Sequence, residues 1–126
     1  VYSSGSSIIY SEEGIGGALV VRNFKSPGKR SSYRYTSVIA AMAITSTHFL
    51  CYTNHRPMIR VEWTDERLAR MEIDTMDGKQ LLVIRWEANL FQESWSGQME
   101  LRLRVQDPVD CQSRIQQQIS KHTTRR

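Results

Sequence analysis

The fold class is decided by the stretch QMELRLRVQ (residues 98–106) and by the Asp107-Pro108 pair that follows it. Apolar and polar residues alternate in this stretch, so that one face carries Met99, Leu101, Leu103 and Val105. Alternation with a period of two residues predicts a half-buried antiparallel strand. The Asp-Pro pair supplies an N-cap carboxylate and a proline for the first helical position, so a helix is expected from residue 108.

Further runs of strand-like sequence precede this stretch. We expect about seven strands in all, drawn from runs at residues 17–24, 31–37, 38–44, 48–53, 58–63, 70–75, 79–86 and 98–106. The strongest turn signal is Asp77-Gly78, which favours a tight hairpin. The helix is expected from Pro108 to about Ser120, with an apolar stripe of Cys111, Ile115 and Ile119. The predicted fold class is therefore mainly β with one C-terminal helix.

Length and composition indicate a single globular domain. The chain has 126 residues, of which 40% are hydrophobic and 24% charged. We expect a flexible lead-in over residues 1–13, the domain over residues 14–120 and a basic tail over residues 121–126. Because the chain begins at Val1 rather than at Met, we also expect it to be a fragment. No apolar run approaches the roughly 20 residues that span a bilayer.

The cysteines and the first glycines carry little functional signal. Cys51 and Cys111 are far apart and form no CxxC motif, which favours buried, reduced thiols over a disulfide or a metal site. Gly14, Gly16 and Gly17 precede the first expected strand without completing a phosphate-binding motif. They favour a tight bend or a bulge over a phosphate loop.

The order of the expected elements resembles the pleckstrin-homology (PH) superfamily, in particular its GRAM-like and bacterial PH-like branches. The local match is Met42-Ala-Ile-Thr-Ser-Thr-His-Phe-Leu-Cys-Tyr52, a hairpin in which the Thr45 hydroxyl would serve the turn and Phe49 the core. The segments 58–63 and 70–73 resemble the strands that follow in the family. The resemblance covers residues 14–120 and implies an orthogonal antiparallel barrel or sandwich capped by the helix.

The best candidate binding site is basic. The net charge is +4, which favours acidic partners, and Lys25, Lys29, Arg30 and Arg34 cluster on and after the first hairpin loop. In PH domains that bind phosphoinositides the first hairpin supplies such cations, because phosphates need several converging donors. The resemblance thus implies an anionic lipid surface as the ligand. A solvated loop and a contact with a protein partner are the alternatives.

Aromatic side chains offer two further interpretations. Phe91 and Trp95 lie in an expected loop and are candidates for a protein-contact surface. Tyr33 and Tyr35 flank Arg34, an interleaving of rings and charge that single-stranded nucleic-acid binders use. Rings at alternate strand positions are more often core or barrel lining, so nucleic acid is the less favoured partner.

No catalytic motif stands out, and we expect neither an enzyme nor a bound cofactor. His48 and Cys51 fall on opposite faces of their strand, which argues against a thiolate–imidazole pair. The function expected is that of a non-enzymatic adaptor module that binds a protein partner or an anionic lipid surface. The alternatives are a β-barrel that binds single-stranded nucleic acid or a small molecule. Such a module would be cytoplasmic, or peripheral to a membrane. The oligomeric state is left open.

Overall fold

The computed structural model describes residues 7–76 and 80–123. The expected Asp77-Gly78 turn and the end of the basic tail lie outside these residues. The described elements are β1 (Ile8–Ser26), β2 (Lys29–Thr45), β3 (His48–Thr53), β4 (Arg56–Glu62), the 3₁₀ helix η1 (Glu66–Arg70), β5 (Glu72–Met76), β6 (Leu81–Glu87), the 3₁₀ helix η2 (Ala88–Leu90), β7 (Ser96–Leu103) and α1 (Pro108–Thr123).

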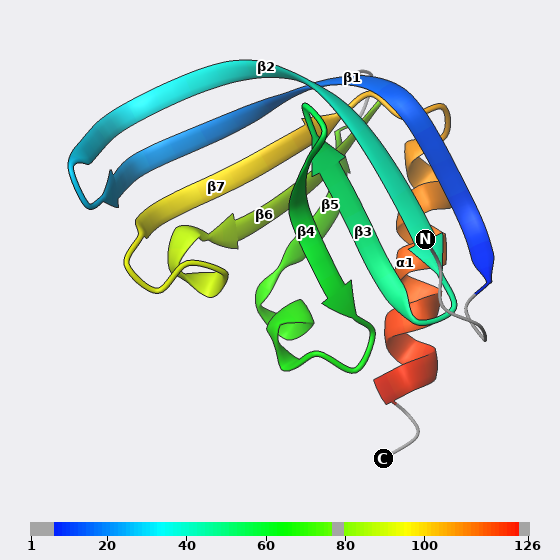
Figure 1. Cartoon of the computed structure of the whole chain (residues 1–126). Helices are drawn as coiled ribbons and strands as arrows, with labels where there is room; N and C mark the ends of the chain where they lie inside the picture. The colour runs from blue at the N-terminus through cyan, green and yellow to red at the C-terminus, as the bar shows by residue number, and fades with distance from the viewer. Residues whose placement is uncertain (1–6, 77–79, 124–126) are drawn as a thin grey trace.

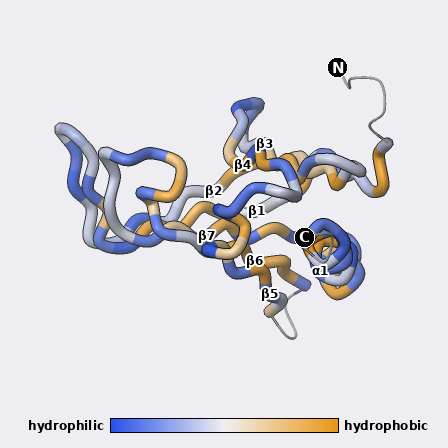
Figure 2. The backbone as a smooth tube through the Cα atoms, turned by 90° about the horizontal axis from the view of Figure 1, so that it is seen from below, coloured by the Kyte–Doolittle hydropathy of each residue, from blue (hydrophilic) through white to orange (hydrophobic). Residues whose placement is uncertain are grey.

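The seven strands form one antiparallel sheet in the order β4-β3-β2-β1-β7-β6-β5. The sheet is strongly curved, and α1 lies at one end of it beside β5 and β6 (Figures 1 and 2). The prediction of a mainly β fold with a C-terminal helix is confirmed. The sheet is open, however, because β4 and β5 are its two edges and do not pair with each other. The expected barrel or sandwich is thus present only as one curved antiparallel sheet that does not close.

The last strand and the helix follow the sequence pattern. Met99, Leu101, Leu103 and Val105 are all buried, whereas Arg104 is exposed. The N–H of Asp110 donates to Asp107 Oδ1 at 3.1 Å, so Asp107 is the expected N-cap. Cys111 and Ile115 are fully buried, and Ile119 packs against the same core. The apolar stripe of the helix thus covers one end of the sheet.

The first strand is longer than expected. Residues 8–13, predicted as part of a flexible lead-in, belong to β1, because Ile8 pairs with Thr45 and the strand continues antiparallel to β2. The register shifts between Glu12 and Ile15, and Gly14 has a φ of +64°. Gly14 therefore lies at the expected bulge, where a left-handed residue is required, whereas Gly16 and Gly17 pair regularly with Ile39 and Val38. The runs 31–37 and 38–44 join into the single strand β2.

The β2–β3 hairpin is built around Thr45. Its buried hydroxyl oxygen accepts the N–H groups of Thr47 at 3.2 Å and His48 at 2.9 Å, which closes the turn. Phe49 is fully buried and stacks on Trp63 with ring centroids 6.0 Å apart. Both roles agree with those implied for Thr45 and Phe49. Cys51 also faces the core, as a free thiol whose pKa is raised to about 12 by burial.

Candidate functional site

Three of the four predicted cations lie at the end of the β1–β2 hairpin, which extends away from α1 (Figure 1). Lys25 is the cross-strand partner of Arg30, and Ser26 is the partner of Lys29, so three of the four cations occupy the last two pairs of the hairpin. Arg34 stands opposite Val21, about 13 Å further along the strand at roughly 3.3 Å per residue. All four side chains are exposed. Within the described residues, none of the four has a carboxylate partner.

The predicted protein-contact pair lies next to this hairpin. Trp95 meets Phe24 of β1 edge to face at 5.2 Å, and the next residue, Ser96, pairs with Lys25. Phe91 contacts the Trp86 ring at 6.2 Å and lies under the Arg67 guanidinium at 4.9 Å. Both Phe91 and Trp95 are half-buried and pack against the core. They fix the η2 loop beside the hairpin and present only part of their rings to solvent.

The largest exposed apolar surface of the hairpin is on β2 itself. Tyr33 is 56% exposed, Tyr35 55% and Ile39 61%, and alternation puts the three on one side of the strand. Rings at alternate strand positions more often line the core, but Tyr33 and Tyr35 are exposed to solvent instead. The Arg22 guanidinium lies over the Tyr33 ring at 5.9 Å. A cation at this distance from a ring centroid is attracted to its face.

The exposure of the tyrosines could have been found by extending one pattern. Val38, Ala40 and Met42 are buried and share one side of β2. Counting back in steps of two from Val38 puts Arg34 on that core side and the tyrosines on the other. The sequence patterns predicted two separate strands, 31–37 and 38–44, so the alternation was not followed from Val38 back to the tyrosines. We call the side with the tyrosines the outer face and the side with Val38 the inner face.

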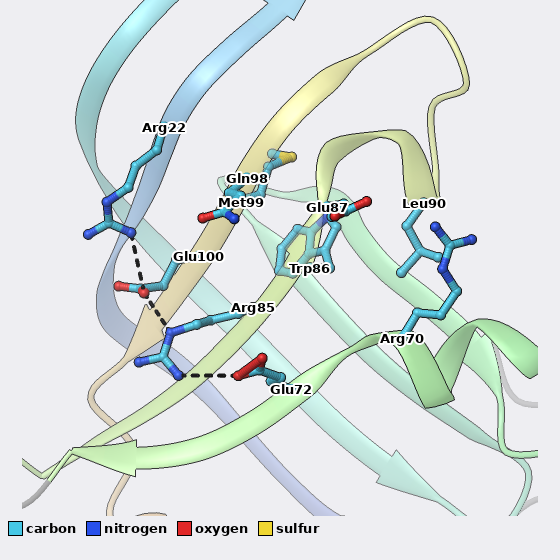
Figure 3. Close-up of a pocket in the computed structure, with 10 residues that line it drawn as sticks. All are labelled: Arg22, Arg70, Glu72, Arg85, Trp86, Glu87, Leu90, Gln98, Met99 and Glu100. Carbon is cyan, nitrogen blue, oxygen red and sulfur yellow. Dashed lines mark hydrogen bonds and ion pairs between the residues drawn. The ribbon is translucent and has the colours of Figure 1, made fainter.

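A buried ion cluster around Glu100 lies on the outer face, in the same cross-strand row as Tyr35. The register aligns Tyr35, Val20, Glu100, Arg85 and Glu72 in one row across β2, β1, β7, β6 and β5. The buried Glu100 carboxylate accepts a hydrogen bond from Arg85 Nε at 2.8 Å and forms an ion pair with Arg22 at 3.6 Å (Figure 3). It also accepts a hydrogen bond from Arg102 Nε at 2.5 Å. Alternation along β7 puts Glu100 on the face opposite Met99 and Leu101. Glu100 is buried because three arginines from three strands cover it.

The electrostatics of this cluster favour the charged carboxylate. Burial alone would raise the pKa of Glu100, but hydrogen bonds from Arg102 and Arg85 outweigh it and lower that pKa. The same hydrogen bond from Arg85 raises the pKa of the arginine. Arg85 also reaches Asp74 at 3.7 Å and Glu72 at 3.9 Å. The cluster is thus an internally compensated network.

Beside the cluster lies a hollow of about 340 Å³ (Figure 3). Its walls include three arginines and three carboxylates: Arg22, Arg70, Arg85, Glu72, Glu87 and Glu100. Opposite charges in equal number leave no net charge to hold an ion of either sign. None of the four hairpin cations lines this hollow.

The formal charges are divided unevenly along the chain. From Gly14 to Val61 there are seven basic residues and no carboxylate: Arg22, Lys25, Lys29, Arg30, Arg34, Arg56 and Arg60. This segment contains all of β2 and β3, residues 14–26 of β1 and residues 56–61 of β4. Arg22 pairs with Glu100 of β7, but Lys25, Lys29, Arg30 and Arg34 have no carboxylate partner within the described residues, so the hairpin attracts negatively charged partners.

Comparison with known proteins gives no further guide, because no family model matches the chain and no curated protein is similar to it in sequence. Within residues 7–76 and 80–123 there is no group of three or more His, Cys, Asp or Glu side chains that could hold a metal ion. No helix in the same ranges is long and apolar enough to cross a membrane.

Proposed function

We propose that the protein is a non-enzymatic binding module with a PH-like fold, and that it docks a protein partner on the outer face of the β1–β2 hairpin. The observation that carries this proposal is the grouping of exposed apolar side chains. Of the five large hydrophobic residues that are exposed in the described chain, Tyr33, Tyr35 and Ile39 share one face of one strand. Exposed apolar side chains grouped on one face beside cations are typical of a protein interface.

The residue types also favour a protein partner. Tyrosine and arginine are the residues that most often dominate the binding energy of protein interfaces. Arg22 is held between the Tyr33 ring and the Glu100 carboxylate, so its guanidinium is ordered before any partner arrives. Pre-ordering lowers the entropy lost on binding. The PH-like fold is supported by the strand order with one C-terminal helix, although the sheet is open.

Peptide display tests this function. A library of random peptides is selected against the wild-type protein, and the dissociation constants of selected peptides are compared with those for the Tyr33→Ser, Tyr35→Ser double variant. We expect the double variant to bind roughly tenfold more weakly or worse, because each hot-spot residue contributes at least about 1 kcal/mol. Val109→Ser is the control, because Val109 is 67% exposed but lies on α1. Equal losses in both variants, or no loss in either, would contradict the proposal.

An anionic lipid surface is the second candidate, favoured by the three cations in the last two pairs of the hairpin. If they bind headgroups, Lys29→Ala with Arg30→Ala should abolish sedimentation with phosphatidylserine vesicles. The melting temperature should hardly change, because both residues are exposed. Arg56→Ala with Arg60→Ala removes the same charge from β4 and is the matched control. Wild-type protein that ignores these vesicles at low salt would eliminate the lipid candidate.

A further inference from the structure

The outer half of β2 has a neighbour on one side only. β1 pairs with β2 along its whole length, whereas β3 pairs only with residues 40–44. No described strand pairs with the other side of β2 from Lys29 to Val38, and Figure 1 shows this half of β2 at the outside of the sheet. We call this side, from Lys29 to Ser37, the free edge. Its residues are exposed except Ser31, which is half-buried.

Two hydrogen bonds establish which backbone groups point to the free edge. Ile39 N–H donates to Asn54 Oδ1 at 3.1 Å, and Ile39 O accepts Asn54 N–H at 2.8 Å. Both groups of Ile39 therefore point away from β1. On β1, the partner of Ile39 is Gly16. The Gly16 carbonyl accepts a hydrogen bond from Arg104 N–H at 2.9 Å and therefore points away from β2. The Gly16–Ile39 pair is thus a non-hydrogen-bonded pair of the β1–β2 ladder.

The direction of the remaining groups follows from the regular register. No shift interrupts the pairing of β1 with β2 between Ile15 and Ser26, so every second pair is of the same kind. The N–H and C=O groups of Ser37, Tyr35, Tyr33 and Ser31 accordingly point to the free edge. The Tyr33 carbonyl accepts a long hydrogen bond of 3.4 Å from the Ser31 hydroxyl. These are the backbone groups that an added strand would bind.

The side chains beside the free edge argue that it is a binding site. Charged residues on an edge strand commonly protect against unwanted pairing, and Lys29, Arg30 and Arg34 could do only that. A protective edge gains nothing from Tyr33 and Tyr35, which project from the same residues whose backbone is unpaired. Rings beside open hydrogen-bonding groups are what a receptor strand needs.

Charge decides what would occupy the edge. A second copy of the chain paired through β2 would bring Lys29, Arg30 and Arg34 of both copies together, with no carboxylate from residues 14–61 on either copy. Like charges on neighbouring strands are destabilising. A strand that carries carboxylates has the opposite sign and is attracted. An acidic segment therefore fits the edge, and a second copy does not.

We propose that the free edge of β2 binds an extended acidic peptide of a partner protein as an additional strand of the sheet. This inference rests on the proposed function and names the class of its partner. Arg30 and Arg34 are four residues apart on one side of β2, so the peptide carries two carboxylates four positions apart. Its alternate positions lie beside Tyr33 and Tyr35 and are apolar or aromatic. The backbone N–H and C=O of Ile39 are already hydrogen-bonded to Asn54, so the added strand ends opposite Ser37.

The test uses a synthetic nine-residue peptide with glutamates four positions apart and with valine or tyrosine at alternate positions. Amide hydrogen exchange of the protein is measured by NMR with and without this peptide. We expect exchange to slow at Tyr33, Tyr35 and Ser37, while Arg34 and Thr36, already bonded to β1, change little. N-methylation of alternate peptide amides should abolish both binding and protection. Arg30→Ala with Arg34→Ala should weaken binding roughly two- to thirtyfold, as expected for two exposed cross-strand charge pairs.

Three outcomes would overturn the inference. Shifts of the Tyr33 and Tyr35 signals without alternate amide protection would mean docking on the rings alone, which leaves the proposed function standing. Protection that appears without peptide and grows with protein concentration would assign the edge to a second copy. Absence of binding at low salt, while peptides from the display library still bind through the tyrosines, would exclude an acidic strand as the partner.

Discussion

Asn54 occupies both backbone hydrogen-bonding groups of Ile39, donating its N–H to the Ile39 carbonyl at 2.8 Å and accepting the Ile39 N–H on Oδ1 at 3.1 Å. It does so from a left-handed conformation with a φ of 49°. Asparagine tolerates this conformation better than most residues. One residue thus joins the β3–β4 turn to β2, through its side-chain oxygen and its backbone N–H, at the point where the free edge begins.

Two substitutions at Asn54 separate the side-chain hydrogen bond from the backbone conformation. Asn54→Gly keeps the left-handed conformation and loses the bond to Ile39 N–H, so we expect a loss of about 0.5–1.5 kcal/mol in the free energy of unfolding. Asn54→Ala loses the same bond and adds the cost of a left-handed alanine, roughly 1–2 kcal/mol more. Urea denaturation measures both. An alanine variant as stable as the glycine variant would contradict this account.

The Glu100 cluster predicts a specific dependence of stability on pH. Hydrogen bonds from the arginines hold the pKa of Glu100 below its ordinary value of 4.5, so the carboxylate stabilises the folded protein above that pH. This stability is lost as the pH falls through the lowered pKa. Glu100→Gln should therefore reduce the free energy of unfolding at pH 7 by roughly 1.5–3 kcal/mol, the range for hydrogen bonds to charged groups. The difference between the variant and the wild type should shrink in acid.

Urea denaturation at pH 7 and at a pH well below 4.5 checks this dependence. Glu93→Gln is the control, because Glu93 is exposed in the η2–β7 loop and has no ion pair within the described residues. It should leave stability nearly unchanged at both values. A deficit of the Glu100→Gln variant that is equally large in acid would show that packing, rather than charge, is lost.

The fold could be predicted from the sequence where the pattern is local. The alternation from Met99 to Val105 and the Asp107 N-cap each depend on neighbouring residues, and both are confirmed. The prediction of a flexible lead-in was wrong for residues 8–13, because Ile8 pairs with Thr45, which lies far along the chain. Closure into a barrel likewise depends on whether the two edge strands meet, which no local pattern encodes.

The candidate site was predictable only in part. The sequence grouped Lys25, Lys29 and Arg30 correctly, because a hairpin keeps residues near its turn together. The burial of Glu100 could not be foreseen, since Arg22 and Arg85 reach it only through the order of β1, β7 and β6. The free edge was hidden for the same reason. It exists because β3 is shorter than the strand with which it pairs.

Two substitutions on β7 should cost clearly more stability than one just after it. Leu103→Ala removes a fully buried side chain and should cost about 2–5 kcal/mol. Arg102→Ala removes a hydrogen bond to the buried Glu100 and should cost roughly 1.5–3 kcal/mol. Arg104→Ala, at an exposed position, should stay within about 0.5 kcal/mol of wild type. Urea midpoints that put Arg102 level with Arg104 would contradict the role given to the cluster.

The last prediction concerns the hydroxyl of Thr45, which is buried and accepts the N–H groups of Thr47 and His48. Thr45→Val keeps the shape of the side chain but leaves both donors without their acceptor, so we expect a loss of roughly 1–3 kcal/mol. Thr45→Ser keeps the hydroxyl and removes only a methyl group, which should cost about 0.8 kcal/mol. A purely hydrophobic role would reverse this order, because valine buries the larger apolar surface. Thermal unfolding of the two variants, together with faster amide exchange at His48 in the valine variant alone, distinguishes the two roles.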